Sequence, residues 1–131
     1  MPLPSAPELA RIGTDRFVYV GTGEYLGASD VPGSPTASSA AIVRHSIYGL
    51  KDDLSPTTIQ RTGGQLAVQT TSRSGSGSTS AVTINAAAIG PRGWLVDLPA
   101  TGERIVGDPQ LVLGALTFTS NAPIGADPCD P

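Results

Sequence analysis

Short segments in which apolar and polar residues alternate recur along the chain. Trp94, Val96 and Leu98 alternate with Leu95 and Asp97, a period of two that predicts a strand. Further strands are predicted at residues 16–20, 46–51, 66–72, 80–85, 103–108, 110–112 and 115–120. The first of these is a continuous run of β-forming residues, so we expect it to be buried on both faces.

The turn residues predict how the C-terminal strands pair. Pro99 presets φ for a tight turn and Gly102 can adopt a positive φ, so residues 93–108 are predicted to form a β-hairpin with a four-residue loop. Pro109 ends this hairpin, because proline cannot donate a hydrogen bond to a strand ladder. A second strand pair is predicted about Gly114.

The middle of the chain predicts another hairpin. Leu66, Val68 and Thr70 are expected to share one face of its first strand, and the second strand begins at residue 80. Ser72–Ser80 holds only Ser, Gly, Thr and one Arg, a composition typical of a flexible loop. We therefore expect two strands joined by a flexible tip.

The N-terminal part is predicted to be less regular. Residues 1–15 are expected to be an irregular lead-in, with at most one helical turn at Glu8–Ile12, and residues 16–131 to belong to a single domain. Gly21-Thr22-Gly23 ends the first predicted strand. Residues 28–41 are small or polar and lack periodicity, which predicts a loop.

Composition supports an all-β fold. The 131 residues include 16 Gly and 12 Pro, which favour frequent turns over long helices. Charged residues make up only 15%, below the average of about 25%, and this suits an exported protein. The net charge is −3 and the basic residues are scattered, so nucleic-acid binding is disfavoured.

Targeting signals are not evident. Residues 1–12 lack the apolar run of a signal peptide, and no stretch approaches the roughly 20 apolar residues of a membrane helix, so we expect no membrane span. Cys129 is the single cysteine, so it cannot form a disulfide within these residues. It either pairs with a cysteine outside them or is a free thiol.

Several residues partly match nucleotide-binding or metal-binding motifs, but each lacks a required feature. The glycines at 21, 23 and 27 miss the spacing of a dinucleotide-binding loop, and prolines forbid the helix that should follow. His45 is the sole histidine, so we predict a hydrogen bond at a strand end rather than a metal ligand. Asp52-Asp53 is predicted to be a solvated turn, because a calcium loop needs alternating oxygen ligands. We expect no metal and no cofactor.

Three carboxylates offer a catalytic alternative. Asp97, Glu103 and Asp108 are close in sequence, and a pair of carboxylates can hydrolyse a glycosidic bond. Asp97 and Asp108, however, stand before turns where Asp often has a structural role. One histidine without a placed acid does not make a Ser-His-Asp triad. We therefore expect no enzyme activity and keep a hydrolase as the less favoured alternative.

Four short motifs follow one another in the C-terminal part: Gly-Trp-x-x-Asp-Leu-Pro at Gly93–Pro99, Gly-Glu-Arg-x-Val-x-Asp-Pro at Gly102–Pro109, Phe-Thr-Ser at Phe118–Ser120 and Asp-Pro-Cys at Asp127–Cys129. In this order they resemble the C-terminal β-propeller domain of the PilC/PilY family, proteins of type IV pilus assembly and of the pilus tip. Gly-Thr-Gly-x-Tyr-Leu-Gly at residues 21–27 and Ser-Ile-Tyr-Gly-Leu at residues 46–50 also resemble family segments, although His45 stands where Gln is usual. The resemblance is weakest over residues 55–91.

The resemblance implies a fold and a function. It implies antiparallel strands forming two or three blades of a propeller, since 131 residues are too few for a complete ring at 40–45 residues per blade. It also implies an exported, non-catalytic module at the cell surface, outer membrane or pilus tip. Its partners would be pilus components, a host surface and the remainder of the propeller. The family's Asp-rich calcium loop is not found, and Arg92-Gly93-Trp94 stands in place of an Arg-Gly-Asp motif.

One further alternative is a carbohydrate-binding or other cell-surface β-domain. Trp94, the only tryptophan, belongs either to the core or to an exposed surface that acts in adhesion.

Overall fold

The structure is a computed structural model, which describes residues 5–23, 27–31, 36–37, 43–74, 81–85 and 88–122. Three sequence expectations concern residues outside these ranges. They are Tyr25 and Leu26 of the glycine motif, residues 75–80 of the predicted loop at 72–80, and Asp127–Cys129.

The described residues contain ten strands and one short 3₁₀ helix. In chain order they are β1 (Glu8–Ile12), β2 (Asp15–Gly21), η1 (Ala28–Asp30), β3 (Ser46–Asp52), β4 (Ala67–Ser74), β5 (Ala81–Asn85), β6 (Gly93–Asp97), β7 (Arg104–Ile105), β8 (Gln110–Val112), β9 (Ala115–Thr117) and β10 (Ser120–Asn121). The part of the chain that the structure describes has no α-helix, so the predicted all-β class is confirmed.

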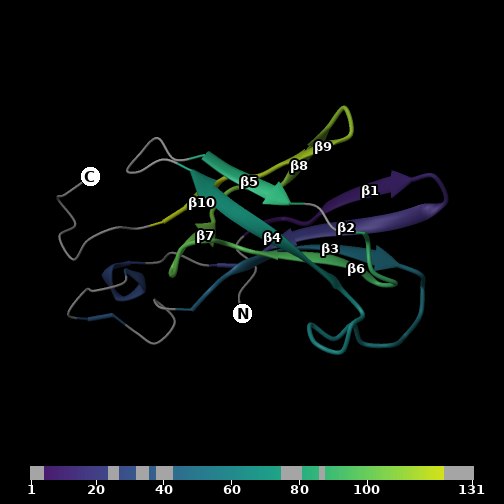
Figure 1. The fold of residues 1–131 in the computed structure, drawn as a ribbon, viewed down its shortest axis with the longest axis horizontal. Coiled ribbons are helices and arrows are strands. Elements are labelled where there is room, and N and C mark those ends of the chain that lie inside the picture. Colours follow the sequence, from purple (N-terminus) through teal and green to yellow (C-terminus); the bar gives the residue numbers. More distant parts are fainter. Residues whose placement is uncertain are drawn as a thin grey trace.

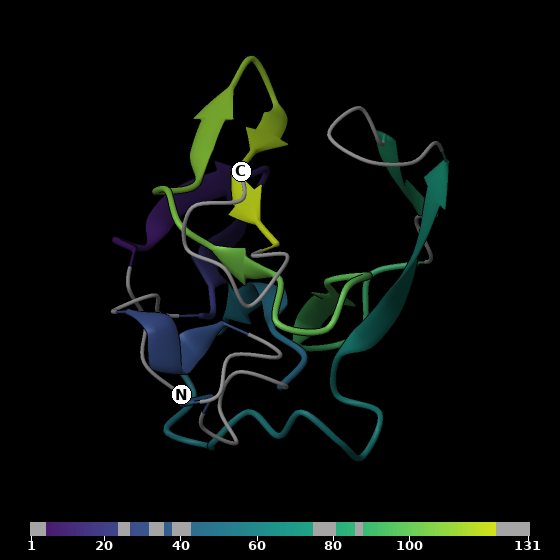
Figure 2. The same cartoon turned by 90° about the vertical axis from the view of Figure 1, so that its left-hand side faces the viewer.

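Six strands form one sheet in the order β1-β2-β3-β6-β4-β5 (Figure 1). Every pairing in it is antiparallel except β4 with β6, which is parallel. Figure 2 shows that this sheet curls into a half-barrel, with the β4–β5 hairpin at one side and the segment β7–β10 at the other. Two further pairs, β10 with β7 and β8 with β9, are also antiparallel.

At the centre of the sheet, Trp94 packs over Gly49. Tyr19, Gly49 and Trp94 are register partners on β2, β3 and β6, so they share one face. The Trp94 ring lies directly over Gly49, where a Cβ would collide with the indole. Its centroid is 6.1 Å from that of Tyr19, which in turn stacks on Phe17. Gly49 thus gives the indole its place in the packing.

The apolar core lies on this same inner face. Ile47, Leu98 and Ile105 form its buried cluster, and Trp94 and Phe118 pack against it. Strand β2 exposes its faces unequally: Phe17 and Tyr19 are buried, whereas its valines are half-buried. The expectation of burial on both faces was therefore too strong.

Residues 1–15 differ from the expected irregular lead-in. Glu8–Ile12 is not a helical turn but strand β1, which pairs with β2 across a turn that contains Gly13 at φ 62°. Its Leu9 is 70% exposed. This edge strand is held by backbone pairing rather than by side-chain burial, so an apolar pattern cannot reveal it.

The hairpin predicted at residues 93–108 is wrong. The turn itself forms, with Gly102 at φ 76° and the Glu103 amide donating to the Ala100 carbonyl at 3.2 Å. The returning strand is only Arg104–Ile105, and it pairs with β10 instead of β6. The reason is that both edges of β6 are already occupied, by β3 and by β4.

The middle hairpin is confirmed as β4–β5, but its facing is not as expected. Val68 is 57% exposed, whereas Gln69 is buried and Leu66 is buried just before the strand begins. Strand β4 also continues through Ser74, into the segment predicted to be loop. The pair about Gly114 is confirmed as β8–β9, with Phe118 just beyond its end.

Candidate functional site

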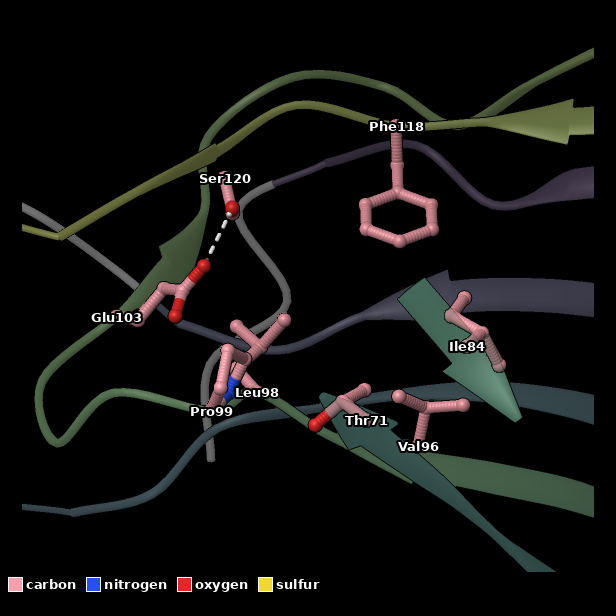
Figure 3. Close-up of a pocket in the computed structure, with 8 residues that line it drawn as sticks. All are labelled: Thr71, Ile84, Val96, Leu98, Pro99, Glu103, Phe118 and Ser120. Carbon is pink, nitrogen blue, oxygen red and sulfur yellow. Dashed lines mark hydrogen bonds between the residues drawn. The ribbon is translucent and has the colours of Figure 1, made fainter. Parts of the chain in front are cut away.

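A groove of about 250 Å³ lies between the β4–β5 hairpin and the segment from β6 to β10. Its lining residues are Thr71, Ile84, Val96, Leu98, Pro99, Glu103, Phe118 and Ser120. In Figure 3 the ring of Phe118 points into the groove toward the strands that carry Ile84 and Val96. Most of these side chains are apolar, which is typical of a surface that binds other apolar groups.

Among the described residues that line the groove, Glu103 is the charged one. Its side chain is buried, and it accepts hydrogen bonds from the Ser120 hydroxyl at 2.7 Å and the Ala100 amide at 3.0 Å (Figure 3). These bonds close the turn after Pro99 and connect it to β10. Glu103 therefore has a structural task at the polar end of the groove.

Asp97 lies on the other face of the sheet, because it follows the groove residue Val96 along β6. It accepts hydrogen bonds of 2.6 Å from the Ser46 hydroxyl and from Arg61 Nη2. Arg61 Nη1 also donates to the Tyr48 hydroxyl at 2.7 Å. Burial acts to raise the pKa of Asp97, but the hydrogen bonds from Arg61 and Ser46 outweigh it and leave that pKa below its usual value.

Asp108 is at a third place. Its carboxylate is exposed and accepts the backbone amide of Ala6 at 2.8 Å, so it ties the N-terminal end of the sheet to the segment before β8. Of the three sequence-predicted carboxylates, only Glu103 lines the groove. The geometry brings no two of them into one cleft, which two-carboxylate hydrolysis requires.

The Gly-Thr-Gly segment forms a seat for strand β7. A Cβ at Gly21 would lie 2.6 Å from the Ile105 side chain, and one at Gly23 would lie 2.6 Å from Arg104 Cβ. Between them, Thr22 accepts the amide of Ile105 at 3.3 Å. Two motifs 80 residues apart in the chain are thus packed against each other, and the glycines are needed for close packing rather than for a nucleotide.

His45 does not make the predicted side-chain hydrogen bond. Its backbone carbonyl accepts the Leu98 amide at 2.9 Å, but its ring is buried and, within the described part of the chain, neither ring nitrogen has a hydrogen-bond partner. Burial, and then the nearby positive charge of Arg104, lower the pKa of His45. Arg104 is buried too, and this pair could not be predicted from the sequence, because charged residues are rarely buried.

Asp52 is the last residue of β3 and Asp53 follows it, so the predicted turn begins only after Asp52, at the bend that contains Leu54. The Asp52 carboxylate accepts the Leu54 amide and the Asp53 carboxylate accepts the Ser55 amide, each at 2.9 Å. Asp53 also pairs with Arg92 at 2.6 Å. Within the described ranges, no three His, Cys, Asp or Glu residues are grouped as metal ligands would be. No helix there is long and apolar enough to cross a membrane.

Trp94 is half-buried and packs against the core cluster, and it is not among the residues that line the groove. The groove itself was not predicted, because its lining comes from strands that are distant in sequence. The predicted hairpin of residues 66–85 was the one partial signal for it, since both of its strands contribute a side chain.

Comparisons with protein families, with curated proteins and with solved structures find no match to this chain.

Proposed function

We propose that this chain is a non-catalytic interaction module of the PilC/PilY kind, exported and acting in type IV pilus biogenesis and surface adhesion. The observation that carries the proposal is an apolar groove beside an open sheet edge. Among the described residues, β5 pairs only with β4, and Ile84 of β5 is 40% exposed at the groove. Such an edge accepts an added strand.

One part of the sheet supports the propeller proposal. Strands β1, β2, β3 and β6 form four adjacent antiparallel strands, the number found in one propeller blade. We propose that they form one blade and that the strands β7–β10 belong to a further blade, while the β4–β5 hairpin extends the first sheet through its parallel pairing with β6. The remainder of the propeller would then be a natural partner for the open edge.

The groove defines how the partner would bind. An extended strand that pairs with β5 would direct every second side chain toward Phe118 and Val96, so its residues at alternate positions would be apolar. The hydrolase alternative gains no support, because Glu103 is the sole carboxylate in the lining and is already bonded to Ser120. No feature of the groove favours a carbohydrate over an apolar strand.

Deletion and complementation in the source bacterium test this function. We expect deletion to reduce surface pili, counted by electron microscopy, and attachment to a surface. Ile84→Lys should fail to restore either one, because it places a charge in the apolar groove. Thr83→Lys is the matched control, since Thr83 is exposed on the same strand and does not line the groove. Normal pili and attachment in the deletion strain would refute the proposal.

A further inference from the structure

Arg104 and His45 form a buried basic pair whose nitrogens, apart from Arg104 Nη2, have no hydrogen-bond partner among the residues that the structure describes. Arg104 is 1% exposed, and its Nε and Nη1 atoms have no hydrogen bond. His45 is 5% exposed, and both of its ring nitrogens are likewise without one. Their chain neighbours Ser46 and Ile105 both hydrogen-bond to Thr22. Burial, and then the charge of Arg104, lower the pKa of His45.

A guanidinium cannot escape this situation by losing its proton. Buried charges in proteins are paired or hydrogen-bonded, because taking an unpaired charge out of water is strongly unfavourable. Two other guanidinium groups have an anionic partner, since Arg61 pairs with Asp97 and Arg92 with Asp53, although the Arg92 Nε atom has no hydrogen bond among the described residues. Arg104 is more deeply buried than either, so it has the greatest need of an anion.

The position of the pair is set by the fold and not by its charges. Thr22 donates its amide to the Ser46 carbonyl at 3.0 Å, and its hydroxyl accepts the Ser46 amide at 2.9 Å. On its other side Thr22 accepts the Ile105 amide. His45 precedes Ser46 and Arg104 precedes Ile105, so these bonds fix the backbone from which both side chains extend. A fixed backbone lowers the cost of ordering a binding site.

We propose that Arg104 and His45 form a binding site for a carboxylate, either free or on a side chain. One guanidinium with a neutral imidazole carries a single positive charge, which a monoanion neutralises without excess. A carboxylate also matches the planar donors of a guanidinium. A neutral imidazole supplies one N–H donor to the same ligand. This inference does not depend on the proposed role at the pilus.

The test uses the full chain and sodium formate as the probe, with sodium chloride at equal ionic strength as the reference. His45 is the only histidine, so its ring signals in an NMR titration are unambiguous. We expect formate to raise the pKa of His45 and to raise the melting temperature, saturably, by at least about 3 °C. Arg104→Met should abolish both effects, whereas Arg16→Met, at an exposed position, should leave them intact.

The two sources of the carboxylate give different results. If a side chain occupies the site, formate has no effect on the wild-type protein, and Arg104→Met lowers the melting temperature by well over 3 °C while Arg16→Met does not. Should Arg104→Met fail to fold, Arg104→Lys keeps the charge and should weaken formate binding at least tenfold, or lower the melting temperature where a side chain is bound. The proposal is overturned if formate has no effect and Arg104→Met melts at or above the wild-type temperature.

Discussion

Two polar clusters begin at adjacent residues of the chain and differ in how their charges are satisfied. Ser46 belongs to the cluster with Asp97 and Arg61, where hydrogen bonds of 2.6 Å to 3.0 Å join all three side chains. His45 belongs to the cluster with Arg104, where both ring nitrogens and the guanidinium Nε and Nη1 atoms have no hydrogen-bond partner among the described residues. The first cluster is partly open to water and the second is enclosed.

This difference indicates that the charges of the Asp97 cluster stabilise the fold, whereas those of the Arg104 cluster are available to a ligand. In the Asp97 cluster the groups complete one another, so the arrangement stabilises the connection between β3, β6 and the loop that carries Arg61. In the Arg104 cluster, hydrogen bonds fix the backbone of the neighbouring residues. The rest of the fold must therefore offset the free energy lost when the buried donors lack acceptors. Unsatisfied buried groups of this kind are where a ligand is to be sought.

The largest effect should come from the apolar support of the Arg104 cluster. Ile105 is fully buried and lies on Gly21, so Ile105→Ala should lower the free energy of unfolding by about 2–5 kcal/mol, as other large-to-small core changes do. Denaturant midpoints measure the change. Val106→Ala is the control, since Val106 is exposed next to it and should lose less than about 0.5 kcal/mol. Equal effects would mean that β7 does not hold Arg104 in place.

The sequence predicted the strands that carry a pattern and missed those that do not. Strands β2, β3, β6, β8 and β9 were expected from alternation or from apolar runs, and the turn at Gly102 from its residue type. Strand β1 was missed because backbone pairing holds it, and the partner of β7 was missed because pairing depends on which edges are free.

The candidate sites were harder to predict from the sequence, because they too depend on contacts between distant segments. Glu103 was singled out as a carboxylate, but its place at the end of a groove depends on Phe118 and Ile84, which come from other strands. Arg104 belongs to the motif at Gly102–Pro109, but the residues next to it in the sequence do not predict that it is buried. Both features arise from packing between segments that are distant in sequence, and local periodicity predicts only secondary structure.

A smaller effect is expected from opening the satisfied cluster. Asp97→Ala leaves the fully buried Ser46 hydroxyl without its acceptor, which should cost about 1–2 kcal/mol. Its ion pair with Arg61 adds little, because both side chains are about a third or more exposed and water screens them. A double-mutant cycle with Ser46→Ala isolates the hydrogen bond. Additive effects of the two changes would show that this bond is not coupled to stability.

The clusters should also differ in the pH range over which they lose stability. His45 has a lowered pKa from burial and Arg104, so the unfolded chain binds a proton more readily and stability falls as the pH drops below the ordinary value of 6.5. Asp97, facing Arg61, Ser46 and the more distant charge of Arg44, has a lowered pKa too, so its contribution is lost below the ordinary 3.8. Stability falls with acid in both cases, but in separate windows.

Two substitutions separate these windows. Across a series of melts from about pH 8 to pH 3, His45→Gln should remove the loss that begins near neutral pH, and Asp97→Asn should reduce the loss at the acid end. If His45→Gln leaves the upper window unchanged, the buried imidazole is not the group that titrates there.

The smallest effect should come from an ion pair with an exposed carboxylate, which serves as a reference for both clusters. Asp53 pairs with Arg92 at 2.6 Å, but the Asp53 side chain is 43% exposed, so the attraction is screened by water. Asp53→Asn keeps an oxygen to accept the Ser55 amide and removes only the charge. We expect a loss of less than about 0.5 kcal/mol, reduced further by salt. Denaturant unfolding at low and high salt measures it. A loss as large as that of Asp97→Ala would mean that enclosure does not decide what a charge contributes in this protein, and the distinction between the two clusters would no longer hold.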